Sequence, residues 1–582
     1  MARTVSLPPP RDLSHHFSSS TKRREASTIK DLYKYFLIPG IANLAGGLPN
    51  ASYFPYDTLE ATVAHPHRFQ PSTSPSHSSS STRVIIPKES QSANLQKKID
   101  VTTALQYGTA DGLPPMATFV RQFTRNHLHP NVPYARGPDT LLTCGSTDGF
   151  CKTIEAFTNT WDPDRDWTSQ REGVLCEEFV YMNAINTVKP RGLNVVPVAM
   201  DAQGMRAHGK GGLADVLKNW DFQRGKRPHL MYTITIGQNP TGGTLSVDRR
   251  REIYALCQQY DIIIVEDDPY WNLQYPSATA QQQDGSTLPH VTAETRNYNA
   301  HGRSSGYAFL DSLVPSYLSL DTDGRVVRLD TFSKTIAPGC RLGWVTAQPA
   351  VIERLARITE TSTQAPSGFV QAMVAELLLG QQVDDSATRG KGADKGWQMD
   401  GWVRWLEGLR GGYERRMQDM CNVLEEGKFI VDPDDAVESA VDEDAAWEIV
   451  DRRQMFDFTW PTAGMFVWIK VRMDTHPLYG KYSPDRLSQA LWVHMTKSPY
   501  LCLLGPGTMF GPTKTVVDYA WQYYRLCFAA MPAEDVKGVT ERLVDGFRSF
   551  WQRKNLDGLE GEEMYAVQAL RMQPGNLLGT GC

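Results

Sequence analysis

One lysine stands between a hydroxyl and an arginine in the run TFSKTIAPGCR, residues 331–341. The amine of Lys334 can form a Schiff base with an aldehyde. The side chains of Ser333 and Arg341 can together hold a phosphate. An aldehyde and a phosphate in one ligand describe pyridoxal phosphate. Taken alone, a Ser-Lys pair is more often a surface lysine beside a structural arginine, so this interpretation depends on residues elsewhere in the chain.

Carboxylates close an apolar run further upstream, in the sequence VEDDPY at residues 265–270. If Asp267 meets the ring nitrogen of the cofactor, its negative charge keeps that nitrogen protonated, and the ring then draws electrons from the substrate. Carboxylates at strand ends are equally common as helix caps or salt-bridge partners. Tyr270 could donate a hydrogen bond to the phenolic oxygen of the ring. So could Asn239 in GQNPTG, a segment that is also typical of a simple turn.

Other positions suit the phosphate, the ring and a substrate carboxylate. Ser146 and Thr147, in TCGSTDG, would begin a helix whose N–H groups and dipole favour an anion. Tyr181 offers a flat face to a pyridine ring, although a lone aromatic is more often part of the core. Arg525 lies in an apolar strand-like run, where a buried guanidinium needs an anionic partner. That partner is either a substrate α-carboxylate or an internal Asp or Glu.

The elements that must position these residues alternate along the chain. Short apolar runs bounded by polar residues predict buried strands at residues 192–198, 230–236, 262–266 and 325–329. A helix is predicted between two of them, over residues 247–260. This alternation predicts an α/β fold, a mainly parallel sheet flanked by helices, whose ligands bind beyond the carboxyl ends of the strands. Strand-like runs at 464–471 and 523–528 predict a smaller α+β domain.

Composition excludes several classes of protein. The 582 residues are 41% hydrophobic and 21% charged, which is ordinary for a globular chain with large cores. A net charge of −5 gives no global attraction to nucleic acid or anionic membranes. Nine scattered cysteines indicate a reducing compartment, with neither disulfides nor a metal site. We expect a cytoplasmic protein. The basic, serine-rich start overlaps mitochondrial presequences, but the prolines at positions 8–10 interrupt a helix there.

Four stretches look inserted, because they are polar and poor in core-forming residues: 65–82, 279–306, 384–396 and 432–444. We expect all four to be mobile surface loops. His65, His67 and His77 in the first stretch lack a regular scaffold that would fix a metal. The predicted organisation is an arm or lid at 1–55, a linker with a low-complexity insertion at 56–104, a large cofactor-binding domain at 105–365 and a small C-terminal domain at 366–582.

In this order, the motifs resemble those of fold-type I pyridoxal phosphate aminotransferases of class I/II, over most of the chain between the insertions. The opening is more specific. DLSHH at 12–16, YKYF at 33–36 and NLAGGLPN at 43–50 are similar to the fungal aromatic aminotransferase and kynurenine/α-aminoadipate aminotransferase branch. That branch usually carries an Arg-x-Pro-Ser-Pro lid. Here the sequence at 24–28 is REAST, which lacks both prolines.

The resemblance implies a role for each residue. Lys334 is the Schiff-base lysine and Asp267 the partner of the ring nitrogen. The remaining cofactor contacts are Asn239 and Tyr270 at the phenolic oxygen, Tyr181 on the ring, and Ser146, Thr147, Ser333 and Arg341 at the phosphate. Arg525, Asn239 and Gly47 lie against the substrate, with Arg525 on its α-carboxylate. Tyr107 corresponds to a tyrosine that reaches the phosphate of the neighbouring subunit, so the resemblance implies a homodimer.

We therefore predict an aminotransferase that moves the α-amino group of an aromatic amino acid to a 2-oxo acid such as 2-oxoglutarate by a ping-pong route. Lys334 would serve as carrier and base. Two alternatives remain. One is a lyase, decarboxylase or carbon–sulfur cleavage on the same scaffold, since fold does not fix chemistry. The other is a ligand-sensing regulator, although the residues before the Ala-Gly-Gly-Leu-Pro segment are too few for a typical helix-turn-helix module.

Overall fold

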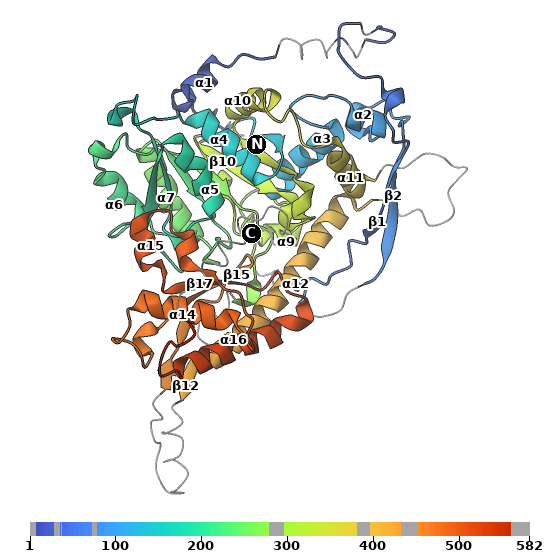
Figure 1. The fold of residues 1–582 in the computed structure, drawn as a ribbon. Helices are drawn as coiled ribbons and strands as arrows, with labels where there is room; N and C mark the ends of the chain where they lie inside the picture. The colour runs from blue at the N-terminus through green and yellow to red at the C-terminus, as the bar shows by residue number, and fades with distance from the viewer. Residues whose placement is uncertain are drawn as a thin grey trace. The chain divides into compact units, whose positions relative to one another are not determined.

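A central seven-stranded sheet runs in the order β3-β11-β10-β9-β8-β4-β5 (Figure 1). All neighbours are parallel except β11, which pairs antiparallel with both β10 and β3. The mainly parallel sheet is therefore confirmed. The strands are β3 Asp139–Thr143, β4 Gly173–Glu177, β5 Asn194–Val198, β8 Leu230–Thr233, β9 Ile263–Asp267, β10 Val326–Thr331 and β11 Gly343–Ala347.

The strand positions follow from short apolar runs. Every residue of β8, β9 and β10 is buried, as expected for strands covered on both faces. The predicted runs at 192–198, 230–236, 262–266 and 325–329 contain or overlap β5, β8, β9 and β10. The antiparallel strand β11 was not predicted, because its sequence GWVTA follows the lysine-bearing loop without an intervening helix.

Helices connect and cover the strands. The predicted helix at 247–260 is α7, whose first turn is capped by the Ser246 side chain. Helix α4 packs against α5 and α10. The helices around this sheet are α1 Ser19–Arg23, α2 Val101–Leu105, α3 Pro114–Phe123, α4 Ser146–Phe157, α5 Met182–Val188, α6 Leu213–Lys218, α7 Val247–Gln259, α9 Ala308–Asp311, α10 Pro349–Glu360, α11 Gly368–Leu379 and α12 Gln398–Gly427. A short hairpin, β6 Met200–Asp201 with β7 Gly204–Met205, completes this part.

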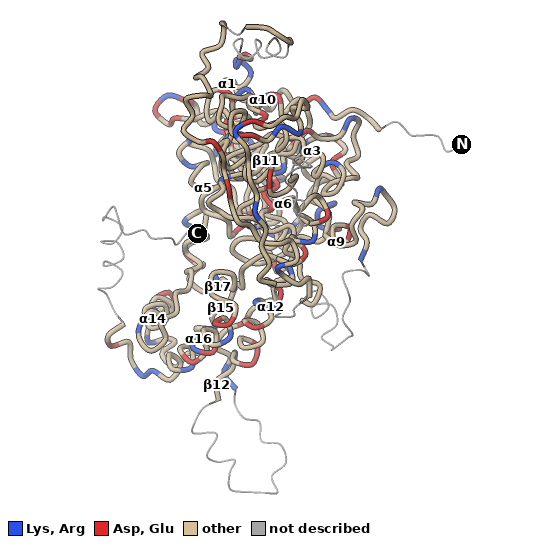
Figure 2. Tube along the Cα trace, turned by 90° about the vertical axis from the view of Figure 1, so that its right-hand side faces the viewer, with Lys and Arg blue, Asp and Glu red and all other residues tan. Residues whose placement is uncertain are grey.

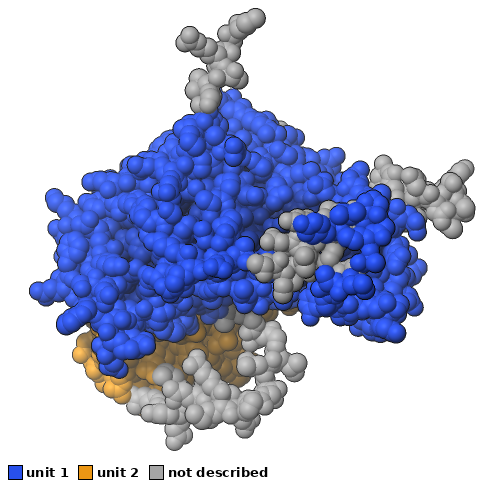
Figure 3. All heavy atoms as spheres, turned by 90° about the horizontal axis from the view of Figure 1, so that it is seen from above, with its two compact units in different colours: residues 1–415, 461–464 blue, residues 416–460, 465–582 orange. Residues whose placement is uncertain are grey.

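The computed structural model describes residues 7–27, 35, 38–42, 44–72, 78–278, 296–380, 396–431 and 452–559. Among the predicted features, residues 33, 34, 36 and 43, the whole of the insertion at 432–444, and the greater parts of those at 279–306 and 384–396 lie outside these ranges. The chain forms two units, residues 1–415 with 461–464 and residues 416–460 with 465–582 (Figure 3). The central sheet belongs to the first unit.

The second unit contains a four-stranded antiparallel sheet in the order β14-β15-β17-β16. The predicted runs at 464–471 and 523–528 contain β15 and β17. Helix α14 packs against α16. The elements are β12 Phe429–Val431, β13 Arg452–Gln454, β14 Phe456–Phe458, β15 Phe466–Val471, α14 Pro484–Thr496, β16 Gly505–Pro506, α15 Lys514–Ala520, β17 Tyr523–Cys527 and α16 Val536–Trp551. The predicted domain boundary at 365/366 stays a prediction. The chain passes from the first unit to the second between residues 415 and 416, within α12.

The insertion at 65–82 joins the strands of a hairpin, β1 Leu59–Ala64 and β2 Ser81–Ile86 (Figure 1). Its residues 65–72 pack against α12. Phe69 packs on Trp405 of α12 with ring centroids 5.4 Å apart, and Arg404 donates to Gln70 at 3.3 Å. Small residues of α12, Gly408 and Gly411, let the backbone of this segment come close. The mobility of the insertion stays a prediction. Composition alone does not reveal such packing.

Charge is distributed in keeping with the small net value. Acidic and basic residues are interspersed along the trace (Figure 2). The described helices include none with the length and apolar character that crossing a bilayer requires.

Candidate active site at the carboxyl edge of the sheet

Lys334 and Asp267 come from neighbouring strands. Asp267 is the last residue of β9 and pairs in register with Leu329 of β10. Lys334 ends the 3-10 helix Phe332–Lys334, which directly follows β10. Parallel strands have their carboxyl ends at the same edge of a sheet, so the structure brings both residues to one edge. Lys334 is half-buried and Asp267 is buried.

The turn that carries Lys334 is anchored by its aromatic neighbour. Phe332 is fully buried, with ring centroids 5.1 Å from Trp344 of β11 and 5.8 Å from Trp402 of α12. The Thr331 side chain accepts a hydrogen bond from the Ser333 backbone at 3.1 Å and caps the turn. Packing and capping together fix the backbone on which the amine is mounted.

One oxygen of Asp267 has a partner and the other does not. The Tyr232 hydroxyl donates to Oδ2 at 2.8 Å, whereas Oδ1 is buried without a hydrogen-bond partner. Burial raises the pKa of Asp267 to about 7, although the bond from Tyr232 acts to lower it. Leaving a buried carboxylate oxygen unsatisfied costs about 1–3 kcal/mol or more. A cationic N–H brought by a ligand would remove this cost.

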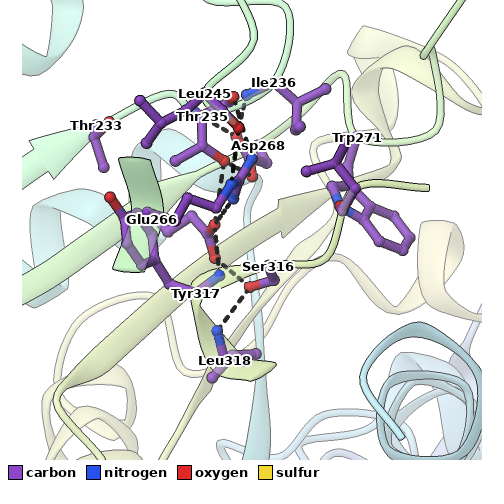
Figure 4. A network of polar contacts seen from close by, with 12 residues as sticks. Thr233, Thr235, Ile236, Leu245, Glu266, Asp268, Trp271, Ser316, Tyr317 and Leu318 are labelled. Carbon is purple, nitrogen blue, oxygen red and sulfur yellow. Dashed lines mark hydrogen bonds and ion pairs between the residues drawn. The ribbon is translucent and has the colours of Figure 1, made fainter. Parts of the chain in front are cut away.

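The carboxylates on either side of Asp267 in the sequence, Glu266 and Asp268, belong to one network of polar contacts (Figure 4). Because side chains alternate along a strand, Asp267 points to the other face of the sheet. Arg328 lies 3.0 Å from Glu266 and 3.1 Å from Asp268, and Arg250 lies 3.0 Å from Glu266. Burial acts to raise the pKa of Glu266, but these two guanidinium groups hold it below its ordinary value. Glu266 and Asp268 therefore have structural partners, which leaves Asp267 to face a ligand.

An anion cradle forms where α4 begins. The Arg341 guanidinium donates to the Cys144 carbonyl at 3.1 Å and to the Ser333 hydroxyl at 3.4 Å. A Cβ atom on Gly145 would lie 2.5 Å from Arg341 Nη2, so only glycine leaves the guanidinium its place. Ser146 and Thr147 follow at the start of α4, where free N–H groups and the helix dipole attract anions.

The backbone of Arg341 is itself constrained. Its φ of +47° lies in the left-handed region that non-glycine residues seldom adopt. Such conformations persist where the surroundings hold them, often at functional sites. Here the side chain is exposed, and its hydrogen bonds to Ser333, to the Pro338 carbonyl and to the Cys144 carbonyl direct it toward the start of α4.

Asn239, Tyr270 and Tyr181 follow the carboxyl ends of β8, β9 and β4, so the structure brings them to the same edge. Asn239 and Tyr270 are 5% and 4% exposed. Gln238, beside Asn239, donates to the Phe179 carbonyl at 2.7 Å and so ties the β8 loop to the segment before Tyr181. The Asn239–Pro240 peptide is cis.

The same loop touches a distant segment backbone to backbone. Gly237 and Gly464 both have positive φ, and a Cβ on Gly237 would lie 2.4 Å from the Gly464 Cα. Tyr275, whose hydroxyl donates to the Gly464 carbonyl, holds that segment from the other side. The close approach of Gly237 and Gly464 thus holds the loop that carries Asn239 against a segment that lies much further along the chain.

Three predicted residues, Tyr107, Gly47 and Arg525, do not follow the carboxyl ends of strands of the central sheet. Tyr107 is 57% exposed and Gly47 is exposed, both in the first unit. Arg525 belongs to the second unit, in β17, with its guanidinium 4.4 Å and 4.8 Å from the ring centroids of Phe466 and Phe510. The described lid residue Arg24 pairs with Glu155 of α4 at 2.5 Å.

Sequence reasoning missed Tyr232 and Arg328. A signal existed for Arg328, because a charged residue inside the buried run VVRL must have an anionic partner. Tyr232 gave no signal, since a tyrosine in a strand is ordinary. Its alignment with Asp267 follows only from the parallel pairing of β8 with β9.

These residues fit pyridoxal phosphate. The unpartnered Oδ1 of Asp267 suits a protonated ring nitrogen, and the cradle of Gly145, Ser333 and Arg341 suits a phosphate. Lys334 stands at the same edge with the amine that an aldehyde requires.

Known proteins share this architecture. Residues 79–543 match the family model of aminotransferase class I and II. An L-tyrosine:2-oxoglutarate aminotransferase, atrD, of Tapinella panuoides is 34% identical over 83% of this chain and 78% of its own length. An aromatic amino acid aminotransferase of Schizosaccharomyces pombe, C56E4.03, is 32% identical over 79% of this chain and 82% of its own.

A solved structure agrees with these relatives. The aminotransferase Aro8 from Candida albicans superposes with a TM-score of 0.71 at 30% identity, covering 94% of this chain and all of its own. The predicted fold, cofactor and class of reaction are confirmed, and a regulator without enzymatic activity is excluded. The chain belongs to the class I and II aminotransferases and is a pyridoxal phosphate-dependent transaminase.

Proposed function

We propose that this transaminase takes the α-amino group from an aromatic amino acid and passes it to 2-oxoglutarate. The observation that carries the site assignment is the buried, unpartnered oxygen of Asp267 at the sheet edge that also bears Lys334. The aromatic donor and the acceptor are supported by relatives named for tyrosine, 2-oxoglutarate and aromatic amino acids.

Each residue of the edge has one task. Bound pyridoxal phosphate supplies the electron-poor ring that takes up the electron pair left at the α-carbon. Asp267 keeps the ring nitrogen protonated. Nζ of Lys334 would remove the α-proton of the substrate and deliver a proton to the cofactor carbon that carried the aldehyde, so that the amino group stays with the cofactor when the oxo acid leaves. The other cofactor contacts are Asn239 and Tyr270 at the phenolic oxygen, Tyr181 on the ring face, and Ser146, Thr147, Ser333 and Arg341 at the phosphate.

Arg525 is proposed to bind the α-carboxylate of the substrate, with Asn239 and Gly47 beside it. An arginine held between two aromatic rings loses little further freedom on binding a carboxylate in two-pronged geometry. Arg525→Lys keeps the charge but loses this geometry. We expect KM for both the amino acid and the oxo acid to rise more than kcat falls.

The test of the reaction is the first half of the cycle. Tyrosine alone should abolish the visible absorption of the protein-bound cofactor and yield one equivalent of oxo acid, and 2-oxoglutarate should restore it. Lys334→Ala should lose both this absorption and transamination, while the exposed control Lys189→Ala should keep them. Release of ammonia or carbon dioxide instead of an oxo acid would mean a lyase or decarboxylase.

A panel of amino donors tests the substrate class. Tyrosine, phenylalanine and tryptophan should exceed alanine and leucine in kcat/KM. Buried apolar contact with a ring is worth several kcal/mol, which corresponds to at least about a hundredfold. Equal values for alanine and tyrosine would contradict an aromatic pocket.

The chain is proposed to work as a homodimer in the cytoplasm, with Tyr107 reaching the site of the partner. Large apolar side chains in the single chain support a covered surface: Leu44, Tyr53 and Tyr107 are 96%, 85% and 57% exposed. Mixing Lys334→Ala chains with Tyr107→Ala chains gives a decisive test. In a mixed dimer, one site has both residues intact only if Tyr107 acts across the interface. Activity above that of either variant alone is expected, and its absence would place Tyr107 within its own subunit.

A further inference from the structure

A cluster of ligand-type side chains lies away from the transaminase site. His15 and His16 belong to the 3-10 helix Ser14–His16, and Asp261 follows α7 in the turn before β9. One ligand atom of each lies within 4.8 Å of the others, and in the described part of the chain this is the one such group of three. This cluster was not predicted from the sequence, because 246 residues separate His15 from Asp261.

The nitrogens converge on one carboxylate oxygen. Asp261 Oδ2 lies 2.7 Å from His15 Nε2 and 3.1 Å from His16 Nε2. Ligand atoms at about 2.0–2.2 Å around a tetrahedral ion lie about 3.3–3.6 Å from one another. The three ligand atoms are therefore close enough to share one ion after small shifts of the exposed His15 and Asp261 side chains.

The Nε2 atom of His16 is close to Asp261 but is not oriented for a hydrogen bond to it. Its side chain is 6% exposed, and Nε2 is buried with no hydrogen-bond partner despite its closeness to Asp261. A buried ring nitrogen in this state is costly. Ligands of a metal point at the ion rather than at each other, so a shared ion would satisfy His16 without moving its ring. That ring is fixed by stacking on His229, with centroids 5.4 Å apart.

The carboxylate is held in position by its own surroundings. Asp261 has a φ of +54°, a left-handed conformation that glycine or asparagine adopts more easily. Its other oxygen lies 3.6 Å from the buried Arg325 guanidinium, which is itself paired with Asp323 at 2.7 Å. Such a contact behind a ligating carboxylate orients the oxygen that faces the metal.

We propose that His15, His16 and Asp261 bind one divalent transition-metal ion of the Zn²⁺ class, which ties the N-terminal segment to the turn between α7 and β9. Two imidazoles and a carboxylate are ligands that Zn²⁺ accepts. His15 and Asp261 are 58% and 49% exposed, so water can fill the remaining positions. The ion takes no part in amino-group transfer. It stabilises the folded chain, because it binds the folded form in preference to the unfolded one.

The test is calorimetric titration of ZnCl₂ into untagged, chelator-treated holoenzyme in a buffer that does not bind metals. One ion per chain should bind, with Kd on the order of 1 μM or below. His15→Ala, at the exposed ligand, should weaken binding at least about tenfold without disturbing the core. Asp261→Asn should do the same, since asparagine tolerates the same backbone conformation. The control His208→Ala removes an exposed histidine elsewhere and should leave binding unchanged.

The melting temperature gives a second readout. Saturating Zn²⁺ should raise it in the wild type and in His208→Ala, but not in His15→Ala. A rival donor pair is His65 with His67, whose rings stack 5.2 Å apart. If Zn²⁺ binding survives in His15→Ala but disappears in the double variant His65→Ala/His67→Ala, the ion belongs to the loop and the proposal is wrong. Absence of stoichiometric binding in the wild type would overturn it equally.

Discussion

Three consecutive carboxylates at the end of β9 have opposite surroundings on the two faces of the sheet. On one face Arg328 pairs with both Glu266 and Asp268, Arg250 pairs with Glu266, and all four side chains are buried. On the other face, one oxygen of Asp267 accepts a hydrogen bond from the Tyr232 hydroxyl, and the second oxygen has no hydrogen-bond partner. The buried ion pairs stabilise the fold, whereas the unpartnered oxygen is available to accept a hydrogen bond from a ligand. Neighbours in sequence thus divide into structural and functional groups by the alternation of a strand.

The largest expected effect lies on the functional face. Asp267→Asn keeps the size and the bond to Tyr232 but removes the charge opposite the ring nitrogen. We expect kcat with tyrosine to fall on the order of 10³-fold, because several kcal/mol of electrostatic stabilisation are lost. Unfolding in urea at pH 6 should barely change. The matched variant Asp268→Asn should instead lower stability, and a reversal of this pattern would refute the division between the faces.

The next effect lies on the structural face. Arg328→Met leaves Glu266 and Asp268 buried with Arg250 as the remaining cation at Glu266. Removing one member of a buried ion network costs about 3–5 kcal/mol. The urea midpoint should therefore drop sharply. Arg251→Met removes an exposed partner of Asp248 on α7 and should stay within about 0.5 kcal/mol of the wild type. Equal midpoints for both variants would show that the buried network contributes little.

A further buried carboxylate, Glu177, tests how a pKa raised by burial affects the pH dependence of stability. Burial raises the pKa of Glu177 to about 8, although the Thr233 hydroxyl and the Ile234 N–H act to lower it. Its folded pKa exceeds the unfolded value, so its contribution is fully present below about pH 4.5 and is lost as pH rises through 8. Glu177→Gln should match the wild type near pH 4, and its advantage should grow from about pH 4.5 upward to a few kcal/mol above pH 9. A constant difference across this range would contradict the raised pKa.

The smallest effect concerns the Tyr232 hydroxyl that donates a hydrogen bond to Asp267. Tyr232→Phe removes a hydrogen bond worth about 1 kcal/mol and leaves both oxygens of Asp267 unpartnered by hydroxyls. The acid limb of the kcat/KM profile should move to higher pH, because that bond lowers the pKa of Asp267. Tyr134→Phe is the control, since the Tyr134 hydroxyl is buried without a partner. An unshifted profile in Tyr232→Phe would mean that the hydroxyl does not act through Asp267.

The sequence predicted the sheet well where apolar runs were short and bounded, as at 230–236 and 262–266. It placed Lys334, Asp267 and Asn239 after strands, and their common edge follows from parallel pairing. It could not show which oxygen of Asp267 stays unsatisfied, because that depends on Tyr232 across the sheet. Packing of residues 65–72 on α12 was also not predicted, because the glycines of α12 that contact this segment lie more than 300 residues further along the chain.

The crossing of Gly237 and Gly464 leaves no room for a side chain at either position. A Cβ on Gly237 would lie 2.4 Å from the Gly464 Cα, and one on Gly464 would lie 2.7 Å from the Gly237 carbonyl oxygen. Even a methyl group at either glycine would therefore force the two backbones apart. Because Gly237 lies two residues before Asn239, such a change would displace a residue that we assign to holding the cofactor.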